Sequence, residues 1–95
     1  MYGIIRRYHF HPKDSDEIDR MIRTGFVPLL KGAKGFVSYH WLDDGNGEGA
    51  SFSIFLDKAG AEESLQLAAD FVRDRLSKVV RLKPEVIEGP IVAHS

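Results

Sequence analysis

Four side chains combine a charge with aromatic surface at spacings that favour ligand binding. Arg6 and Tyr8 are separated by one residue, as are Tyr39 and Trp41, so in extended chain each pair points to one face. Burying an unpaired guanidinium is costly. In a binding site, Arg6 would hold a phenolate or carboxylate while Tyr8, Tyr39 and Trp41 stack on the ring of that ligand. The alternative is that Arg6 pairs with an acid such as Glu88 and the aromatic residues form ordinary core, which we favour because pockets are few and aromatic cores are common.

Histidines are the candidates for proton transfer. His9 and His11 share a face of an extended segment, and His40 lies near the end of another. Histidines on strands can bind zinc, copper or iron, but no acidic residue completes a ligand set here. The two segments are also expected to lie about two strand spacings apart, ~9.6 Å. We predict no metal and solvated or interface histidines, with His9 and His40 as candidate bases for a phenol.

The glycine-dense segment from Asp44 to Gly49 resembles the start of a calcium loop. Phe55 occupies its twelfth position, where such a loop requires an acidic residue. The segment is therefore predicted to be the tip of a hairpin, and a lid over the pocket is one role for it.

The strands and helices that carry these residues are predicted from the spacing of apolar residues and from the glycines and prolines that end such patterns. Asp14 and Glu17 have the spacing of a capping box, and Pro28 should distort the helix that follows. Asp57 is a plausible cap for a second helix, on which Leu67 and Phe71 are expected to form an exposed partner surface or pocket lip. The predicted strands are residues 2–10, 36–42, 50–56 and 86–92. The first predicted helix begins at Asp14 and is closed by Gly32 and Gly35. The second begins at Asp57, carries basic residues as far as Arg81 at its C-terminal end, and is stopped by Pro84.

Strand, helix, strand, strand, helix, strand is the order of a ferredoxin-like α+β sandwich. Two right-handed crossovers give an antiparallel sheet of order 4-1-3-2, with both helices on one face and residues 86–92 at an edge. We expect residues 1–95 to form this single domain. Val37 is expected to share a face with Tyr39 and Trp41, and Phe36 to lie opposite. Large apolar residues on both sheet faces predict that a second copy covers the bare face.

The amino-acid composition excludes several classes of binding partner. The 95 residues include 13 basic and 14 acidic side chains and no cysteine. The balanced charge lacks the basic signature of nucleic-acid or anionic-membrane binding, and thiolate zinc and thiol catalysis are excluded. With no apolar run of membrane-spanning length and no signal peptide, we predict a cytoplasmic protein that binds neither nucleic acid nor membrane.

The chain resembles the antibiotic biosynthesis monooxygenase family of the dimeric α/β-barrel superfamily. The resemblance rests on the order of elements and on the segments Gly25–Leu30, Gly35–Tyr39 and Ala61–Ser64. It implies a homodimer with a ligand pocket between sheet and helices in each subunit. It also implies activities such as cofactor-independent oxygenation of phenols, quinol oxygenation or haem degradation.

Haem degradation is disfavoured by departures from that family. Haem-degrading members resemble one another in an asparagine on the first strand, a tryptophan on the third and a histidine on the second helix, and this chain lacks all three. We therefore expect a homodimer without a cofactor that binds, and as an oxidoreductase oxygenates, a small hydrophobic or aromatic compound. Arg6, Tyr8, Tyr39 and Trp41 are the expected binding residues. The alternatives are a non-catalytic ligand-binding or stress-response module and an isomerase of the same superfamily.

Overall fold

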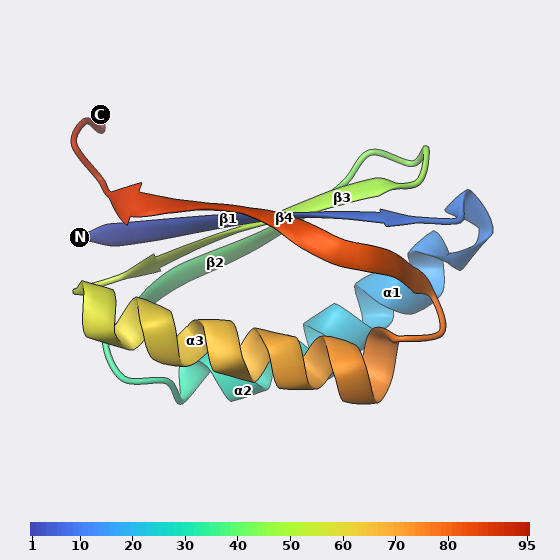
Figure 1. Cartoon of the computed structure of the whole chain (residues 1–95), viewed down its shortest axis with the longest axis horizontal. Coiled ribbons are helices and arrows are strands. Elements are labelled where there is room, and N and C mark those ends of the chain that lie inside the picture. The colour runs from blue at the N-terminus through green and yellow to red at the C-terminus, as the bar shows by residue number, and fades with distance from the viewer.

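The computed structural model describes the main chain of residues 1–95 and the side chains of residues 1–80 and 84–95. Four antiparallel strands form one sheet in the order β2-β3-β1-β4, and the helices lie against one face of it (Figure 1). This is the predicted 4-1-3-2 order seen from the other edge, so the ferredoxin-like α+β fold is confirmed. The opposite face of the sheet carries no helix.

The elements follow the predicted order, but both helical segments contain a π-helical turn. In chain order they are β1 (Tyr2–Phe10), the 3-10 turn η1 (Pro12–Asp14), α1 (Ser15–Met21), the π turn η2 (Ile22–Phe26), α2 (Val27–Lys31), β2 (Phe36–Asp43), β3 (Glu48–Phe55), α3 (Lys58–Phe71), the π turn η3 (Val72–Leu76) and β4 (Val80–Pro90).

The start of the first helical segment differs from prediction, whereas its distortion is confirmed. Asp14 makes no side-chain capping bond; instead the His11 ring accepts a hydrogen bond from the Lys13 main-chain N–H at 3.2 Å, at the start of η1. Pro28 lies in the first turn of α2, directly after η2. Because proline supplies no N–H to the preceding turn, the chain widens into a π turn before it and restarts.

The last strand is longer than predicted. β4 begins at Val80 and runs through Pro84, which was expected to precede the strand. The pairing with β1 shifts between Arg7, opposite Glu85, and His9, opposite Arg81. Pro84 lies in that irregular stretch, and because β4 is an edge strand, as predicted, a missing N–H is tolerated there.

The predicted faces are wrong at the start of β2. Its register against β3 shifts between Phe36 and Ser38, which leaves Val37 outside the ladder and 40% exposed. Val37 therefore does not share the buried face with Tyr39. Phe36 is the residue that packs into the core, with its ring centroid 6.1 Å from that of Phe55. An extra residue in one strand inverts the alternation beyond it, and alternation alone cannot reveal such a bulge.

The core lies between the sheet and the helices and includes a residue expected at the surface. Phe71 is buried, with its ring centroid 5.2 Å from that of Phe26, so it forms no exposed surface with Leu67. Gly25 lies against this ring, and a Cβ atom there would be 3.0 Å from it, so a larger residue would require the Phe71 ring to shift.

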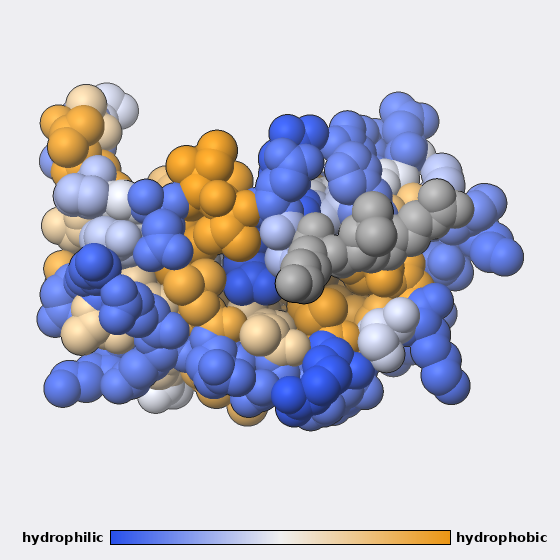
Figure 2. Space-filling view, viewed as in Figure 1, coloured by the Kyte–Doolittle hydropathy of each residue, from blue (hydrophilic) through white to orange (hydrophobic). Residues whose placement is uncertain are grey.

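The open face of the sheet carries an apolar row across three strands. Ile5 in β1 lies opposite Phe52 in β3 and Ile87 in β4, and all three are exposed. In Figure 2, apolar side chains stand above the sheet to the left of the middle of the view, with hydrophilic ones beside them. Among the helices of the described residues, none is sufficiently long and apolar to cross a membrane.

Candidate functional site

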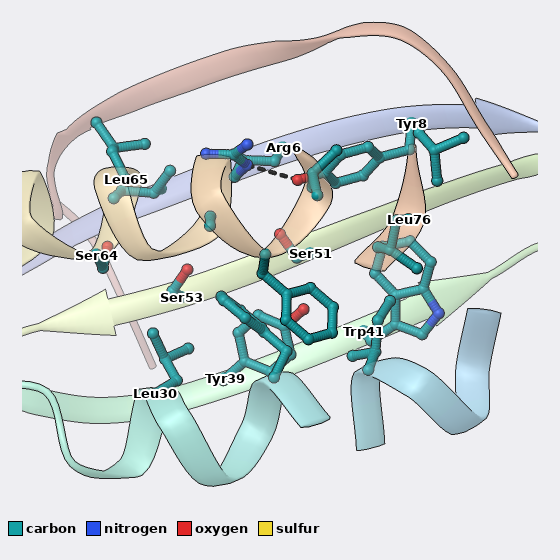
Figure 3. A pocket seen from close by; sticks show the side chains of 17 residues that line it. Arg6, Tyr8, Leu30, Tyr39, Trp41, Ser51, Ser53, Ser64, Leu65 and Leu76 are labelled. Carbon is teal, nitrogen blue, oxygen red and sulfur yellow. Dashed lines mark hydrogen bonds between the residues drawn. The ribbon is translucent and has the colours of Figure 1, made fainter. Parts of the chain in front are cut away.

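A cavity of about 30 Å³ lies between the sheet and the helices. That volume holds roughly two water molecules. Residues of η2 and α3 close the cavity from the helix side. Its sheet side includes all four residues predicted to bind a ligand and two serines: Arg6, Tyr8, Tyr39, Trp41, Ser51 and Ser53 (Figure 3).

Strand register explains why these residues meet. Ser51 in β3 lies opposite Arg6 in β1 and opposite Trp41 in β2, so the three form one row across the sheet. Ser53 lies opposite Tyr39 in the next row. Because paired residues of an antiparallel sheet point to the same face, all of them face the helices.

Arg6 is a buried charge without a carboxylate partner among the described side chains. The residue is only 7% exposed, and its Nε–H donates a hydrogen bond to the Tyr8 hydroxyl at 2.7 Å. The guanidinium carbon lies 5.6 Å from the centre of the Tyr8 ring. The alternative partner, Glu88, instead accepts a hydrogen bond from the Tyr2 hydroxyl at 2.9 Å. The site therefore has a positive charge available to an anion.

The two tyrosines of the cavity are held in the neutral form. Burial raises the pKa of Tyr8, although the charge of Arg6 and its hydrogen bond act in the opposite direction. Burial also raises the pKa of Tyr39 above its ordinary range, and Tyr8 adds to this, whereas Ser51 and Arg6 lower it. Both tyrosines therefore offer hydroxyl groups, not phenolates, to a ligand at neutral pH.

Trp41 forms part of the wall between the cavity and a cleft on the outside. The cleft, of about 340 Å³, shares Ile22, Tyr39 and Trp41 with the cavity. The Trp41 indole N–H donates a hydrogen bond to Asp19 Oδ1 at 2.8 Å, and its ring lies over Gly49, where a Cβ atom would be only 2.5 Å away. The indole thus stands between the outer cleft and the cavity that contains Arg6.

Asp19 belongs to a pair of carboxyl groups at the outer cleft. Burial raises the pKa of Asp19, and the proximity of Asp43 adds to this, while the bond from Trp41 opposes it. Burial acts to raise the pKa of Asp43 as well, but hydrogen bonds from the Gly45 N–H, Asp19 and Ser15 outweigh it, and the pKa is lowered. A proton shared by the pair therefore resides preferentially on Asp19.

The structure does not bring the candidate histidines to the cavity. His9 and His40 alternate with cavity residues of β1 and β2, so they point to the open face of the sheet. His9 lies 3.8 Å from Glu48, which also accepts a 2.8 Å hydrogen bond from Arg7. A role for either histidine in proton transfer stays a prediction, and any such role would be at the open face of the sheet and not in the cavity. Among the described residues, no three His, Asp or Glu side chains are grouped to hold a metal ion.

Sequence reasoning did not identify Ser51, Ser53 or Asp19 as site residues. Ser51 and Ser53 interrupt the apolar alternation of a central strand with small polar residues, which is a readable signal. Asp19 has no comparable signal, because its contact with Trp41 depends on how α1 packs on β2.

No family model matches the sequence, and neither does any curated protein. Solved structures do match it over nearly its whole length. A protein of unknown function from Nitrosomonas europaea has a TM-score of 0.82 and 18% identity, covering 99% of this chain and 91% of that one.

Two other matches have described activities. The heme-degrader MhuD from Mycobacterium tuberculosis, solved with two hemes in its active site, has a TM-score of 0.77 and 11% identity over 100% of this chain and 99% of that one. SnoaB, a cofactor-independent oxygenase from Streptomyces nogalater, has a TM-score of 0.71 and 12% identity over 98% and 94%. The chain thus has the fold of the antibiotic biosynthesis monooxygenase-like proteins, as its sequence indicated.

Proposed function

We propose that the chain binds a small oxygenated aromatic compound in the cavity beside Arg6 and oxygenates it without a cofactor. The observation that carries this proposal is a buried guanidinium that no described carboxylate neutralises, in a cavity otherwise lined by aromatic, aliphatic and hydroxyl groups. Cofactor-independent oxygenation is the activity named for SnoaB, which has the same fold.

Electrostatics favour an anionic ligand. Desolvating a lone charge costs several kcal/mol, and one hydrogen bond from Arg6 to the neutral Tyr8 hydroxyl offsets only part of this. A phenolate or carboxylate oxygen at Arg6 supplies the missing opposite charge. The rings of Tyr8 and Trp41, whose centroids lie 5.9 Å apart, offer apolar surface to the ring of such a ligand.

The chemistry needs little from the protein beyond charge and orientation. A phenol with a free para carbon reacts with one molecule of O₂ to give a para-quinone and water. One oxygen atom enters the ring, and the substrate supplies both electrons and both hydrogens of the water. Ionisation to the phenolate makes the ring electron-rich, and Arg6 stabilises that anion at a fixed position.

One observation favours a second candidate, a non-catalytic binding module. No carboxylate or imidazole of the described residues lines the cavity to receive the phenolic proton. The Asp19–Asp43 pair lies in the outer cleft on the far side of Trp41. Under this alternative the ligand binds as a preformed anion and leaves unchanged.

The test combines binding and turnover. Trp41 is the only tryptophan, so its fluorescence should report aromatic ligands that reach the wall of the cavity. Phenols, quinols and aromatic acids are titrated into the wild type and Arg6→Met, and oxygen uptake is measured with each ligand that binds. Uptake that depends on Arg6 supports the oxygenase, whereas saturable quenching without uptake supports the binding module. If no compound binds, both candidates are wrong.

We further propose a homodimer formed through the open sheet face. The row Phe52–Ile5–Ile87 exposes apolar surface where a sandwich with one solvated face would have polar residues. Sedimentation equilibrium of the wild type should give twice the chain mass of 10.7 kDa, and Phe52→Glu should give the monomer. Leu29→Glu, at an exposed apolar position on α2, is the matched control and should remain dimeric. A monomeric wild type contradicts the proposal.

A further inference from the structure

The cavity between the sheet and the helices combines one cation with neutral hydrogen-bond donors. Arg6 is the one charged residue among the described residues that line it, and its hydroxyl-bearing residues are Tyr8, Tyr39, Ser51, Ser53 and Ser64. Burial raises the pKa of Tyr8 and of Tyr39, so both keep their hydroxyl protons at neutral pH. A guanidinium among groups that can donate hydrogen bonds, with no described carboxylate beside it, is suited to an anion.

Three of these donors lie together at one end of the cavity. The Arg6 Nε–H donates to the Tyr8 hydroxyl at 2.7 Å, whereas the two Nη groups form no hydrogen bond with a described residue. The Tyr8 hydroxyl accepts that bond and keeps its own proton to donate. Ser51 lies directly opposite Arg6 in the pairing of β1 with β3, and Figure 3 shows its side chain beside the Arg6–Tyr8 pair. One small acceptor at this place would meet a charged donor and two hydroxyl groups.

The size of the cavity restricts the kind of anion. Its volume of about 30 Å³ holds roughly two water molecules. A halide ion is similar in size to a water molecule, whereas an aromatic ring is too large for the closed cavity. Sulfate is larger than a halide and carries one charge more than Arg6 can balance. Water alone leaves the buried guanidinium without an opposite charge, which is costly, and one halide supplies that charge.

We propose that, when no organic ligand is bound, the cavity holds a halide ion such as chloride between Arg6, Tyr8 and Ser51. The ion is the counter-charge of the guanidinium in the closed protein. This binding site goes beyond the proposed function and does not require it. The two are linked by competition, because an aromatic anion at Arg6 needs the place that the halide occupies.

Urea denaturation at constant ionic strength tests for the halide, with sodium chloride replacing sodium gluconate, whose anion is too large for the cavity. Because a ligand of the folded state raises the folding equilibrium constant by the factor 1 + [L]/Kd, about 0.3 M chloride should raise that constant at least about threefold in the wild type. Arg6→Met should abolish the increase, and Ser51→Ala should weaken chloride binding about tenfold by removing one donor. Arg7→Met is the matched control and should keep the full increase, because Arg7 is half-exposed and paired with Glu48.

Diffraction from crystals of the wild type grown in sodium bromide locates the ion directly. Bromide scatters anomalously and is chemically close to chloride, so an anomalous peak is expected within hydrogen-bond distance of the Arg6 Nη atoms and the Ser51 hydroxyl. This measurement does not depend on the folding of any variant. Bromide found only at the surface of the protein, with none beside Arg6, would overturn the inference.

Competition with benzoate separates this inference from the proposed function. The dissociation constant of benzoate should rise about twofold when the chloride concentration equals the dissociation constant of chloride. If chloride does not stabilise the wild type, or stabilises Arg6→Met equally, the halide site is wrong, and benzoate binding still tests the proposed function. If chloride binds as expected but benzoate fails to bind, or binds independently of chloride, the halide site stands and the aromatic anion is not held at Arg6.

Discussion

Replacing Arg6 by methionine should make the unliganded protein more stable and abolish anion binding. Methionine is unbranched and fills irregular space in a core, so it can occupy the volume of the arginine stem without a charge. An ordinary structural arginine would show the opposite behaviour, because losing its ion pair would destabilise the fold. The sign of the change therefore distinguishes a group kept for a ligand from one kept for the fold.

The magnitude follows from the contacts of Arg6. Burying an unpaired ion costs several kcal/mol, whereas the hydrogen bond to Tyr8, at 2.7 Å the one that Arg6 forms with a described side chain, returns about 1.5–3 kcal/mol. The variant also leaves the Tyr8 hydroxyl without this donor, which reduces the gain. We expect a net stabilisation of about 1–2 kcal/mol, and each kcal/mol raises Tm by roughly 4–8 °C in a domain of this size.

Urea denaturation at one fixed protein concentration measures this difference, with and without benzoate. Arg7→Met is the matched control, because Arg7 is half-exposed and paired with Glu48 at 2.8 Å, and its loss should cost at most about 1 kcal/mol. Saturating benzoate should stabilise the wild type and Arg7→Met but not Arg6→Met. A destabilisation of Arg6→Met by more than about 1 kcal/mol would refute the view that Arg6 is unpaired.

Three further predictions concern the wall of the cavity and the metal content. Asp19→Asn keeps an acceptor for Trp41 and removes the carboxyl group with the raised pKa. The stability that a carboxyl group with a raised pKa contributes is lost as pH rises from its ordinary pKa of 3.8 through its pKa in the folded state. The variant should therefore become more stable than the wild type towards neutral pH, and a pH-independent difference in melting temperature would contradict this. Gly49→Ala should displace the Trp41 ring, cost about 1–3 kcal/mol in urea denaturation and shift the tryptophan emission, and an unchanged spectrum would show that the ring is not packed there. Elemental analysis and absorption spectra of the purified protein should show neither stoichiometric metal nor a Soret band, and either signal would contradict the prediction of a cofactor-free protein.

Local pattern was sufficient to predict the sheet and most of its buried face. Arg6 alternates with Arg7, and Tyr39 alternates with His40. Because successive side chains of a strand point to opposite faces, this alternation predicts which residues share a face. The order of elements then fixed the neighbours of each strand. Prediction failed at Val37, where a bulge changes the register, and at Val80, where an edge strand tolerates Pro84. Both features depend on pairing with another strand, which local sequence does not specify.

The candidate site was predictable where charge or size conflicts with burial. Arg6 among apolar neighbours is such a conflict, and the serines of β3 are another that requires knowing which face the helices cover. The contact of Asp19 with Trp41 and the burial of Phe71 beside Gly25 depend on helix packing and had no signal in the sequence. Tertiary packing determines where Asp19 and Phe71 lie, because neither aspartate nor phenylalanine is restricted to the core or to the surface.

The small size of the cavity bears on how the proposed ligand binds. A volume of about 30 Å³ does not admit an aromatic ring, whereas the neighbouring cleft of about 340 Å³ does, and Ile22, Tyr39 and Trp41 belong to both. Binding therefore requires a second arrangement of this wall, and the measured affinity is the intrinsic affinity reduced by the fraction of molecules in that arrangement. The wall contains the parts suited to such a change: Ile22 begins a π turn, and Trp41 is tied to α1 by its bond to Asp19. A ligand that enters from the cleft must therefore offset the free energy of opening this wall, and neutralising the guanidinium is the largest contribution that the site offers it.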